Sequence, residues 1–209
     1  MITPDDIKAS ALVGGFPSKL RVARVPLADP ASYRALLHAD EWHAASAYDG
    51  RRRQEHVAGQ LAARIALEAL VGEAAHHAVI ARDRDGAPEV RGLPPLVSIS
   101  HGRRFAVAVV GQVRALGIDL CEHEQSARVR RVAERFISAE ENALAAADDW
   151  ATLWALKEAA AKALRRGLLE GGLRASCVAS LEPPRFAWPA LEAVLARSDD
   201  DVVAVVYSP

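Results

Sequence analysis

The sequence has few cysteines, few lysines and almost no net charge. Its two cysteines, Cys121 and Cys177, lie far apart and form neither a ligand pair nor a disulfide framework, which favours a reducing compartment. A formal net charge of −1 argues against a non-specific nucleic-acid binder, because such proteins need excess cations to displace counterions. No apolar run approaches the ~18 residues of a membrane helix, and the start MITPDDIKAS is unlike a signal peptide. We therefore expect a cytoplasmic protein that binds neither nucleic acid nor membrane.

The shortage of lysine makes two neighbouring lysines conspicuous. Of 26 cationic residues, 22 are arginine and four are lysine, at Lys8, Lys19, Lys157 and Lys162. Lysine is a compact, flexible point charge that can contact a single oxygen, whereas arginine presents a planar fork. Lys157 and Lys162 are therefore candidates for a specific role.

The first part of the chain is predicted to contain helices followed by strands. Apolar spacing predicts helices from about Asp29 to Val71, with a stop at Gly72. The segment DRDGAPEVRGLPP then predicts a loop or a pair of short edge strands. Three strand-like segments follow, at 96–100, 105–110 and 113–120, and the two-residue connection between the last two predicts a hairpin.

The second part is predicted to contain helices followed by short strands. Ser138 and Glu141 have the spacing of a capping box, so a helix is expected to begin there. A second helix is expected from about Asp149 to Arg166, and VVAVVY at 202–207 is typical of a strand. The chain is therefore predicted to have an α+β fold with antiparallel sheets, in one domain or two small ones.

Two carboxylates and a lysine form the first candidate site. Trp154, Glu158 and Lys162 are spaced by four residues, which places them on one face of the predicted helix. Asp119 ends the apolar segment GIDL, where a carboxylate is disfavoured unless it has a partner or turns towards solvent. An exposed salt bridge would explain Glu158 and Lys162, but a divalent cation shared by Asp119 and Glu158 explains both carboxylates. Magnesium is the natural choice, because it binds carboxylates, waters and substrate phosphates.

Basic and polar residues form a second candidate site for phosphate. Ser100 and His101 close one strand segment, and three arginines, Arg52 among them, open the long helix at 51–64. Free backbone amides at a helix start also favour a phosphate there. The alternatives left open are a solvated basic turn and a structural histidine.

The order of these motifs resembles that of the Sfp-type 4′-phosphopantetheinyl transferases. It runs HVAGQLAAR, SISH, GID, FISAEE and WALKEAAAK, and it covers residues 51 to 168. The similarity is greatest to the branch that serves siderophore and other peptide synthetases. It implies transfer of the phosphopantetheine arm of coenzyme A to a serine of an apo carrier protein. It also implies a monomer of two pseudo-twofold halves, 1–112 and 113–209, with coenzyme A in the cleft between them.

The resemblance also assigns roles to individual residues. Asp119 and Glu158 match the magnesium ligands, and Glu158, with water or with Glu141, matches the base for the carrier serine. Lys162, assisted by Lys157, matches the cation on the transferred phosphate. Three further residues match positions that hold the nucleotide end of coenzyme A: Arg52, Ser100 and His101.

The sequence departs from the family pattern at three positions. Cys121 stands where an acidic residue is usual, Ala87 where a lysine is common and Arg165 where a glycine is common. On a regular strand Glu122 faces away from Asp119, although a β-bulge could turn it back. The departures leave open an impaired member that binds coenzyme A or has a regulatory role. A magnesium-dependent phosphohydrolase from outside the family, using the same two carboxylates, is a second alternative.

Overall fold

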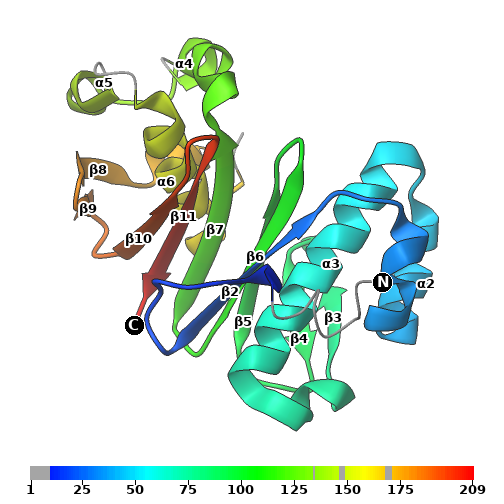
Figure 1. Ribbon diagram of the computed structural model, residues 1–209. Helices are drawn as coiled ribbons and strands as arrows, with labels where there is room; N and C mark the ends of the chain where they lie inside the picture. Colours follow the sequence, from blue (N-terminus) through cyan, green and yellow to red (C-terminus); the bar gives the residue numbers. More distant parts are fainter. Residues whose placement is uncertain (1–9, 134, 146–148, 168–170) are drawn as a thin grey trace. The chain divides into compact units, whose positions relative to one another are not determined.

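The computed structural model describes residues 10–133, 135–145, 149–167 and 171–209 (Figure 1). The chain divides into two compact units, residues 1–112 and 113–209, and each is described by itself. The predicted α+β class with antiparallel sheets is confirmed. The cleft expected for coenzyme A stays a prediction.

The first unit has a long helix on a four-stranded sheet. The sheet has the order β1-β2-β6-β5 and all its pairs are antiparallel. In Figure 1, helix α3 runs along this sheet, and it packs on β2, β5 and β6. The elements are β1 (Leu12–Val13), β2 (Leu20–Pro26), η1 (Pro30–Leu36), α2 (Ala39–Ala44), η2 (Ala45–Ala47), α3 (Gly50–Val71), η3 (Gly72–His77), β3 (Val79–Arg82), β4 (Pro88–Arg91), β5 (Leu96–His101) and β6 (Phe105–Gly111).

Helix α3 forms because its middle is almost entirely small and apolar. Every residue from Val57 to Leu67 is buried, and the helix stops at Gly72, whose φ of 61° belongs to the left-handed region. The helix lies close to the sheet at Gly59, because a Cβ there would be 2.9 Å from Ile99 Cγ2. The segment read as a loop or a pair of short edge strands contains a turn and one strand, β4, which pairs with β3 just before the segment.

The second unit repeats the arrangement of a helix on an antiparallel sheet. Its sheet has the order β10-β11-β7, with α6 packed on β7 and β11 and a separate hairpin, β8 with β9. The elements are β7 (Ala115–Glu122), η4 (His123–Gln125), α4 (Ser126–Ala133), α5 (Ala139–Ala145), α6 (Trp150–Ala163), η6 (Gly172–Arg174), β8 (Cys177–Leu181), β9 (Pro184–Trp188), β10 (Glu192–Arg197) and β11 (Asp201–Ser208).

The predicted hairpin between 105–110 and 113–120 is wrong. Strand β6 pairs with β2 and β5, whereas β7 pairs with β11, so the two consecutive strands belong to different sheets. The capping box is confirmed, because Ser138 N donates to Glu141 Oε2 at 3.0 Å and Glu141 N donates to Ser138 Oγ at 3.2 Å. Within the described ranges, no helix combines the length and apolar character needed to cross a bilayer.

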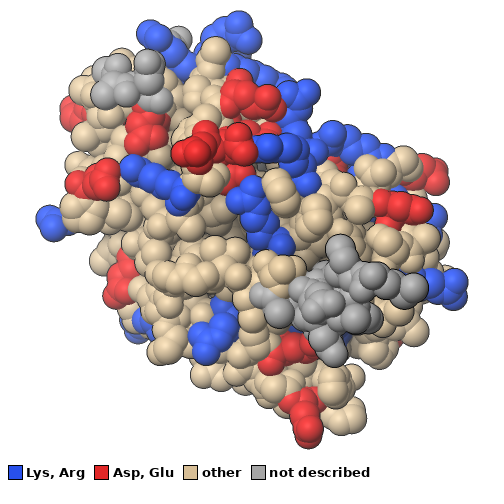
Figure 2. Space-filling view, in the orientation of Figure 1, with Lys and Arg blue, Asp and Glu red and all other residues tan. Residues whose placement is uncertain are grey.

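The surface carries both charge signs. Figure 2 shows acidic and basic side chains interspersed on the visible face. This mixture agrees with the formal net charge of −1. Binding of an anion therefore depends on local groups rather than on a field from the whole chain.

Candidate active site

The site in the second unit begins with Asp119 on strand β7. Asp119 pairs with Ala204 of β11 in the middle of strand β7, and its side chain is only 6% exposed. The alternative of a strand-end aspartate turned towards solvent is therefore wrong. A buried carboxylate in a strand needs partners, because its transfer from water is otherwise costly.

Helix α6 supplies those partners because it lies directly on β7 at Gly117. Side chains of a strand alternate between its two faces, so Asp119 projects from the same face as Gly117. Along α6, the three residues predicted to share a face, Trp154, Glu158 and Lys162, are partly exposed. Most residues around them on the helix are buried. The face that carries the chemistry is therefore the one that reaches the surface.

Lys162 is bound to strand β7. Its Nζ donates to Asp119 Oδ1 at 2.7 Å and to the carbonyl oxygen of Ile118 at 2.9 Å. This ion pair runs from the helix to the strand rather than along the helix. The lysine side chain is 28% exposed, so its outer part remains accessible.

Glu158 lies against Asp119. Burial is the largest factor that raises the pKa of Glu158 to about 7, followed by the negative charge of Asp119. The Lys162 ammonium and a hydrogen bond from the Trp154 indole act in the opposite direction, whereas a hydrogen bond with Asp119 adds to the increase. Two carboxyl groups are therefore close enough to share a proton.

This pair fits a magnesium ion by its chemistry. Carboxylate oxygens are the hard ligands that magnesium prefers, and a shared cation would relieve the repulsion between them. Among the described residues, no group of three or more His, Cys, Asp and Glu side chains could hold a metal ion. Asp119 and Glu158 are thus two adjacent carboxylates, and their role as magnesium ligands stays a prediction.

Strand β7 shows why neither neighbour supplies a third carboxylate. The register from Ala115 to Glu122 runs without interruption, so the possible β-bulge is absent from this pairing. Cys121 therefore shares the face of Asp119, and Glu122 projects from the other face and accepts from Gln125 Nε2 at 2.7 Å. Burial, followed by the charges of Asp119 and Glu158, raises the pKa of the Cys121 thiol, so the group stays protonated at neutral pH.

Glu141 and Lys157 form a separate buried ion pair. Lys157 Nζ donates to Glu141 Oε1 at 2.8 Å and to the Ser176 carbonyl oxygen at 2.6 Å. Glu141 also accepts from Val178 N at 2.9 Å, and both side chains of the ion pair are 2% exposed. The pair joins α5, α6 and β8. These contacts favour a structural role over the catalytic and cofactor-binding roles expected from the sequence.

The three residues expected to hold the nucleotide end belong to the first unit. Ser100 is buried on β5 and His101 is exposed at its end, where Nδ1 lies 3.8 Å from Glu55 Oε1. Arg52 is exposed on the first turn of α3, and its guanidinium carbon lies 5.5 Å from the Tyr48 ring centroid. Glu55 and Arg51 are ion-paired at 2.7 Å, and Arg51 donates to the carbonyl oxygens of Gly102 and Arg103 at 3.2 Å. The start of α3 and the end of β5 therefore lie together.

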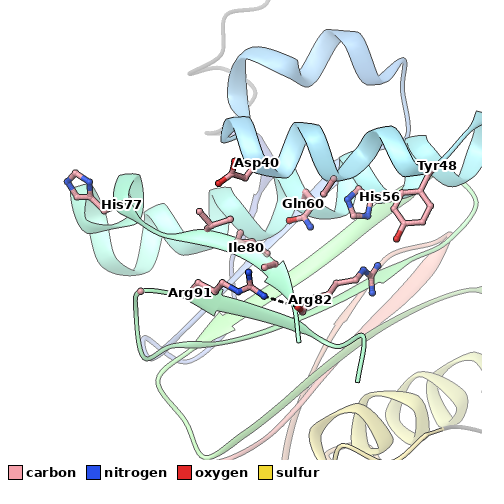
Figure 3. Close-up of a pocket in the computed structure, with 12 residues that line it drawn as sticks. Asp40, Tyr48, His56, Gln60, His77, Ile80, Arg82 and Arg91 are labelled. Carbon is pink, nitrogen blue, oxygen red and sulfur yellow. Dashed lines mark hydrogen bonds between the residues drawn. The ribbon is translucent and has the colours of Figure 1, made fainter. Parts of the chain in front are cut away.

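A pocket of about 600 Å³ also lies in the first unit (Figure 3). Its walls come from α2, Tyr48 just after η2, α3, the last residue of η3 and the β3–β4 hairpin. In the close-up, His56 and Gln60 of α3 lie opposite Arg82 of β3 and Arg91 of β4. None of the three residues expected to hold the nucleotide lines it, although Tyr48, which Arg52 covers, does.

Two buried polar atoms of the pocket lack a hydrogen-bond partner among the residues that the structure describes. They are His56 Nε2 and Gln60 Oε1, and Gln60 is only 4% exposed. Burial and the nearby charge of Arg82 lower the pKa of His56 to about 4, so the imidazole is neutral at neutral pH. An unsatisfied buried group is costly unless a ligand or water supplies the missing bond. The pocket is therefore suited to a ligand with polar groups.

Sequence reasoning missed the pocket residues, although a signal was present. His56, Gln60 and Arg64 recur every four residues in a helix that is otherwise mostly small and apolar there. Arg64 is explained by a buried ion pair with Glu41, in which its Nε donates to Glu41 Oε2 at 3.0 Å. The polar row on one helix face could have indicated a polar cavity. Arg82 and Arg91 could not be assigned to it without the pairing of β3 with β4.

The second unit thus presents two carboxylates and a lysine on one partly exposed face, a set suited to a phosphate-bearing substrate and a hard cation. Residues 115–192 match the family model of the 4′-phosphopantetheinyl transferase superfamily. The matched segment runs from β7 to the first residue of β10 and contains Asp119, Glu158 and Lys162. The match supports this superfamily, and with it a transferase of the phosphopantetheinyl type. A comparison with curated proteins found no match.

Proposed function

We propose that this chain transfers the 4′-phosphopantetheine group of coenzyme A to a serine of an apo acyl or peptidyl carrier protein. We also propose that it belongs to the Sfp-type branch that serves siderophore and other peptide synthetases. The observation that supports the transfer is the contact of Asp119 with Glu158 and Lys162 inside the segment matched by the superfamily. The motif order in the first unit favours the branch.

In this proposal the reaction is a single displacement at phosphorus, and each site residue has a role in it. The serine oxygen bonds to the β-phosphorus of coenzyme A, the bond from that phosphorus to the bridging oxygen breaks, and 3′,5′-ADP leaves. Glu158 accepts the serine proton, and Lys162 neutralises charge on the phosphate being transferred. Asp119 and Glu158 would hold magnesium, which when bound neutralises charge on the pyrophosphate. Phosphoryl-type transfer needs positioning and charge neutralisation more than an enzyme nucleophile.

The nucleotide end is proposed to bind at the first unit. Arg52 lies over Tyr48, which lines the pocket of Figure 3, and His101 is exposed beside Glu55 of the same helix. Arg52 and His101 would bind the 3′-phosphate, and the pocket would take the base. A volume of about 600 Å³ lies within the usual range for a ligand pocket. Glu141 and Lys157 have no proton-transfer role in this scheme, because their pair is buried.

The test is to incubate the protein with coenzyme A, magnesium and an apo carrier, and to weigh the carrier. A mass gain of one phosphopantetheine group is expected. Glu158→Gln should abolish it and Lys162→Ala should slow it by ~100–1000-fold, the usual effect of losing one charge-stabilising contact. Arg166→Ala is the matched control, because Arg166 is an exposed cation just after α6.

The same assay separates the other hypotheses. An impaired member, suggested by Cys121 and Ala87, would bind coenzyme A without modifying any carrier. A phosphohydrolase would release phosphate from coenzyme A when no carrier is present. Either result, or full turnover by Glu158→Gln in folded protein, would contradict the proposed function.

A further inference from the structure

Lys162 and Asp119 form an ion pair at the edge of the site. The ammonium contacts two oxygens of β7, the Asp119 carboxylate at 2.7 Å and the Ile118 carbonyl at 2.9 Å. Asp119 is almost fully buried, and its side chain is 6% exposed. The carboxylate therefore offers little room for a second cation while the ammonium stays in place.

The same carboxylate is assigned to magnesium in the proposed function. Two cations on one buried carboxylate would repel each other strongly, because the surroundings screen charge poorly. We propose that Lys162 and a divalent cation compete for Asp119. Lys162 holds the carboxylate in the metal-free protein and leaves it when the cation binds. This inference rests on the proposed function and adds an exchange of partners to it.

The exposure and contacts of Lys162 allow such an exchange, whereas those of Lys157 do not. The Lys162 side chain is 28% exposed, so it can leave Asp119 for solvent or for a substrate phosphate without burying an unpaired charge. Lys157 is 2% exposed and held by Glu141 and the Ser176 carbonyl oxygen, so its departure would leave a buried carboxylate unpaired. A lysine also exchanges one oxygen for another more readily than an arginine fork does.

The exchange gives Lys162 two roles: it pairs with Asp119 when no metal is bound, and its release depends on metal binding. Without metal it neutralises Asp119 beside Glu158, which limits the repulsion between two carboxylates in one site. When the metal binds, Lys162 leaves Asp119 and becomes available to the substrate phosphate. The order of events then protects the site from binding the substrate phosphate without its cation.

The first test measures the reactivity of Lys162 rather than transfer. The chain has four lysines, so peptide mass spectrometry after brief treatment with an amine-acylating reagent reports each one. Adding magnesium should increase acylation of Lys162 severalfold and leave partly exposed Lys19 of the first unit unchanged. Lys157 should stay unmodified in folded protein, because it is buried. In Asp119→Asn, Lys162 should react fast whether or not magnesium is added.

The second test measures metal binding without coenzyme A, by electron paramagnetic resonance of Mn²⁺. Lys162→Met should bind Mn²⁺ severalfold more tightly than wild type, because no ammonium has to leave Asp119. Arg166→Met removes the same charge from an exposed position and should change the affinity much less. Equal gains in the two variants would indicate a general charge effect and overturn the exchange.

Three further outcomes overturn the inference: acylation of Lys162 that magnesium leaves unchanged, acylation that magnesium slows, and Mn²⁺ binding to neither wild type nor Lys162→Met. The carrier assay keeps this inference apart from the proposed function. Active protein with metal-insensitive Lys162 would overturn the exchange alone. Loss of transfer together with metal-dependent Lys162 would overturn the function and leave the exchange supported.

Discussion

A Cβ atom on Gly117 would lie 1.9 Å from the carbonyl oxygen of Ala159 and 2.7 Å from the amide nitrogen of Ala163. Both atoms belong to the backbone at the C-terminal end of α6, so no side-chain rotation could relieve the clash. Gly117 thus lets the helix lie directly on β7. Because Glu158 and Lys162 flank this contact on the helix and Asp119 follows it on the strand, the glycine sets the spacing of the site.

Gly117→Ala should therefore push α6 away from β7. We expect a loss of about 1–3 kcal/mol in unfolding free energy, the usual cost of overpacking, and a loss of transfer activity in the protein that remains folded. Urea denaturation measures the first effect and the carrier mass assay the second. Gly14→Ala is the matched control, because a Cβ at Gly14 meets no atom within 4 Å. Equal stability of both variants would show that α6 does not depend on the glycine.

The ion pair of Lys157 and Glu141 should contribute to stability. Lys157→Met leaves the Glu141 carboxylate buried and unpaired, so we expect a loss of about 3–5 kcal/mol in urea denaturation. The double variant Lys157→Met and Glu141→Gln should recover part of it, because no charge then stays buried, and the single amide oxygen can still accept from either Ser138 N or Val178 N. Arg197→Met breaks two partly exposed ion pairs, with Glu182 and with Asp149, and should cost under about 1 kcal/mol for each. A small effect of Lys157→Met on stability with strongly reduced transfer would instead favour the catalytic role.

Contacts to the 3′-phosphate of coenzyme A and contacts to its base should respond differently when the 3′-phosphate is removed. Arg52→Ala and His101→Ala should each weaken coenzyme A at least about tenfold more than dephospho-coenzyme A, because a charge-assisted hydrogen bond contributes ~1.5–3 kcal/mol. Gln60→Leu should weaken both ligands equally, since Gln60 would contact the base rather than the 3′-phosphate. Titration calorimetry measures all three. Equal losses of both ligands in Arg52→Ala would place the 3′-phosphate elsewhere.

Local patterns predicted the parts of the fold that local physics determines. The helical face of Trp154, Glu158 and Lys162 and the capping box of Ser138 follow from spacings within one helix turn, and both are present. The hairpin predicted at 105–120 failed because strand partners are chosen by the whole fold. Strand β7 packs against α6 and pairs with β11 of its own unit, and these contacts outweigh a short connection to β6.

The chemistry of the site was predictable in residue type but not in pairing. Periodicity identified Glu158 and Lys162, yet it could not reveal that Lys162 bonds to Asp119, because that contact crosses from a helix to a strand 43 residues away. The sequence also could not show which side chains are buried. Nothing local indicates that Lys157 faces Glu141, whereas its neighbour Glu158 reaches Asp119. The pocket around His56 and Gln60 depends on a hairpin that the sequence left ambiguous.

The two residues after Leu120 should differ in their effect on magnesium dependence. Glu122→Gln should leave the magnesium concentration for half-maximal transfer nearly unchanged, because Glu122 projects away from Asp119. Cys121→Asp should lower that concentration, because it adds a hard ligand on the face of Asp119. It should also destabilise the metal-free protein, because a third carboxylate would join two others. A severalfold increase in Glu122→Gln, with no decrease in Cys121→Asp, would make Glu122 the third ligand.

Acid should destabilise the first unit through His56. Burial, and to a lesser degree Arg82, lowers the pKa of His56 from 6.5 to about 4 in the folded protein. Between these values the unfolded chain binds a proton that the folded chain does not, so the free energy of unfolding falls as the pH decreases through this window. Below about pH 4 both states carry the proton and this contribution stops changing. His56→Gln should therefore flatten the decrease in urea midpoint between about pH 7 and pH 5, while His101→Gln, at a half-exposed side chain, should retain it. If the two variants keep the same pH dependence as wild type, His56 is protonated readily in the folded protein, and the pocket that surrounds it is open to water rather than dry.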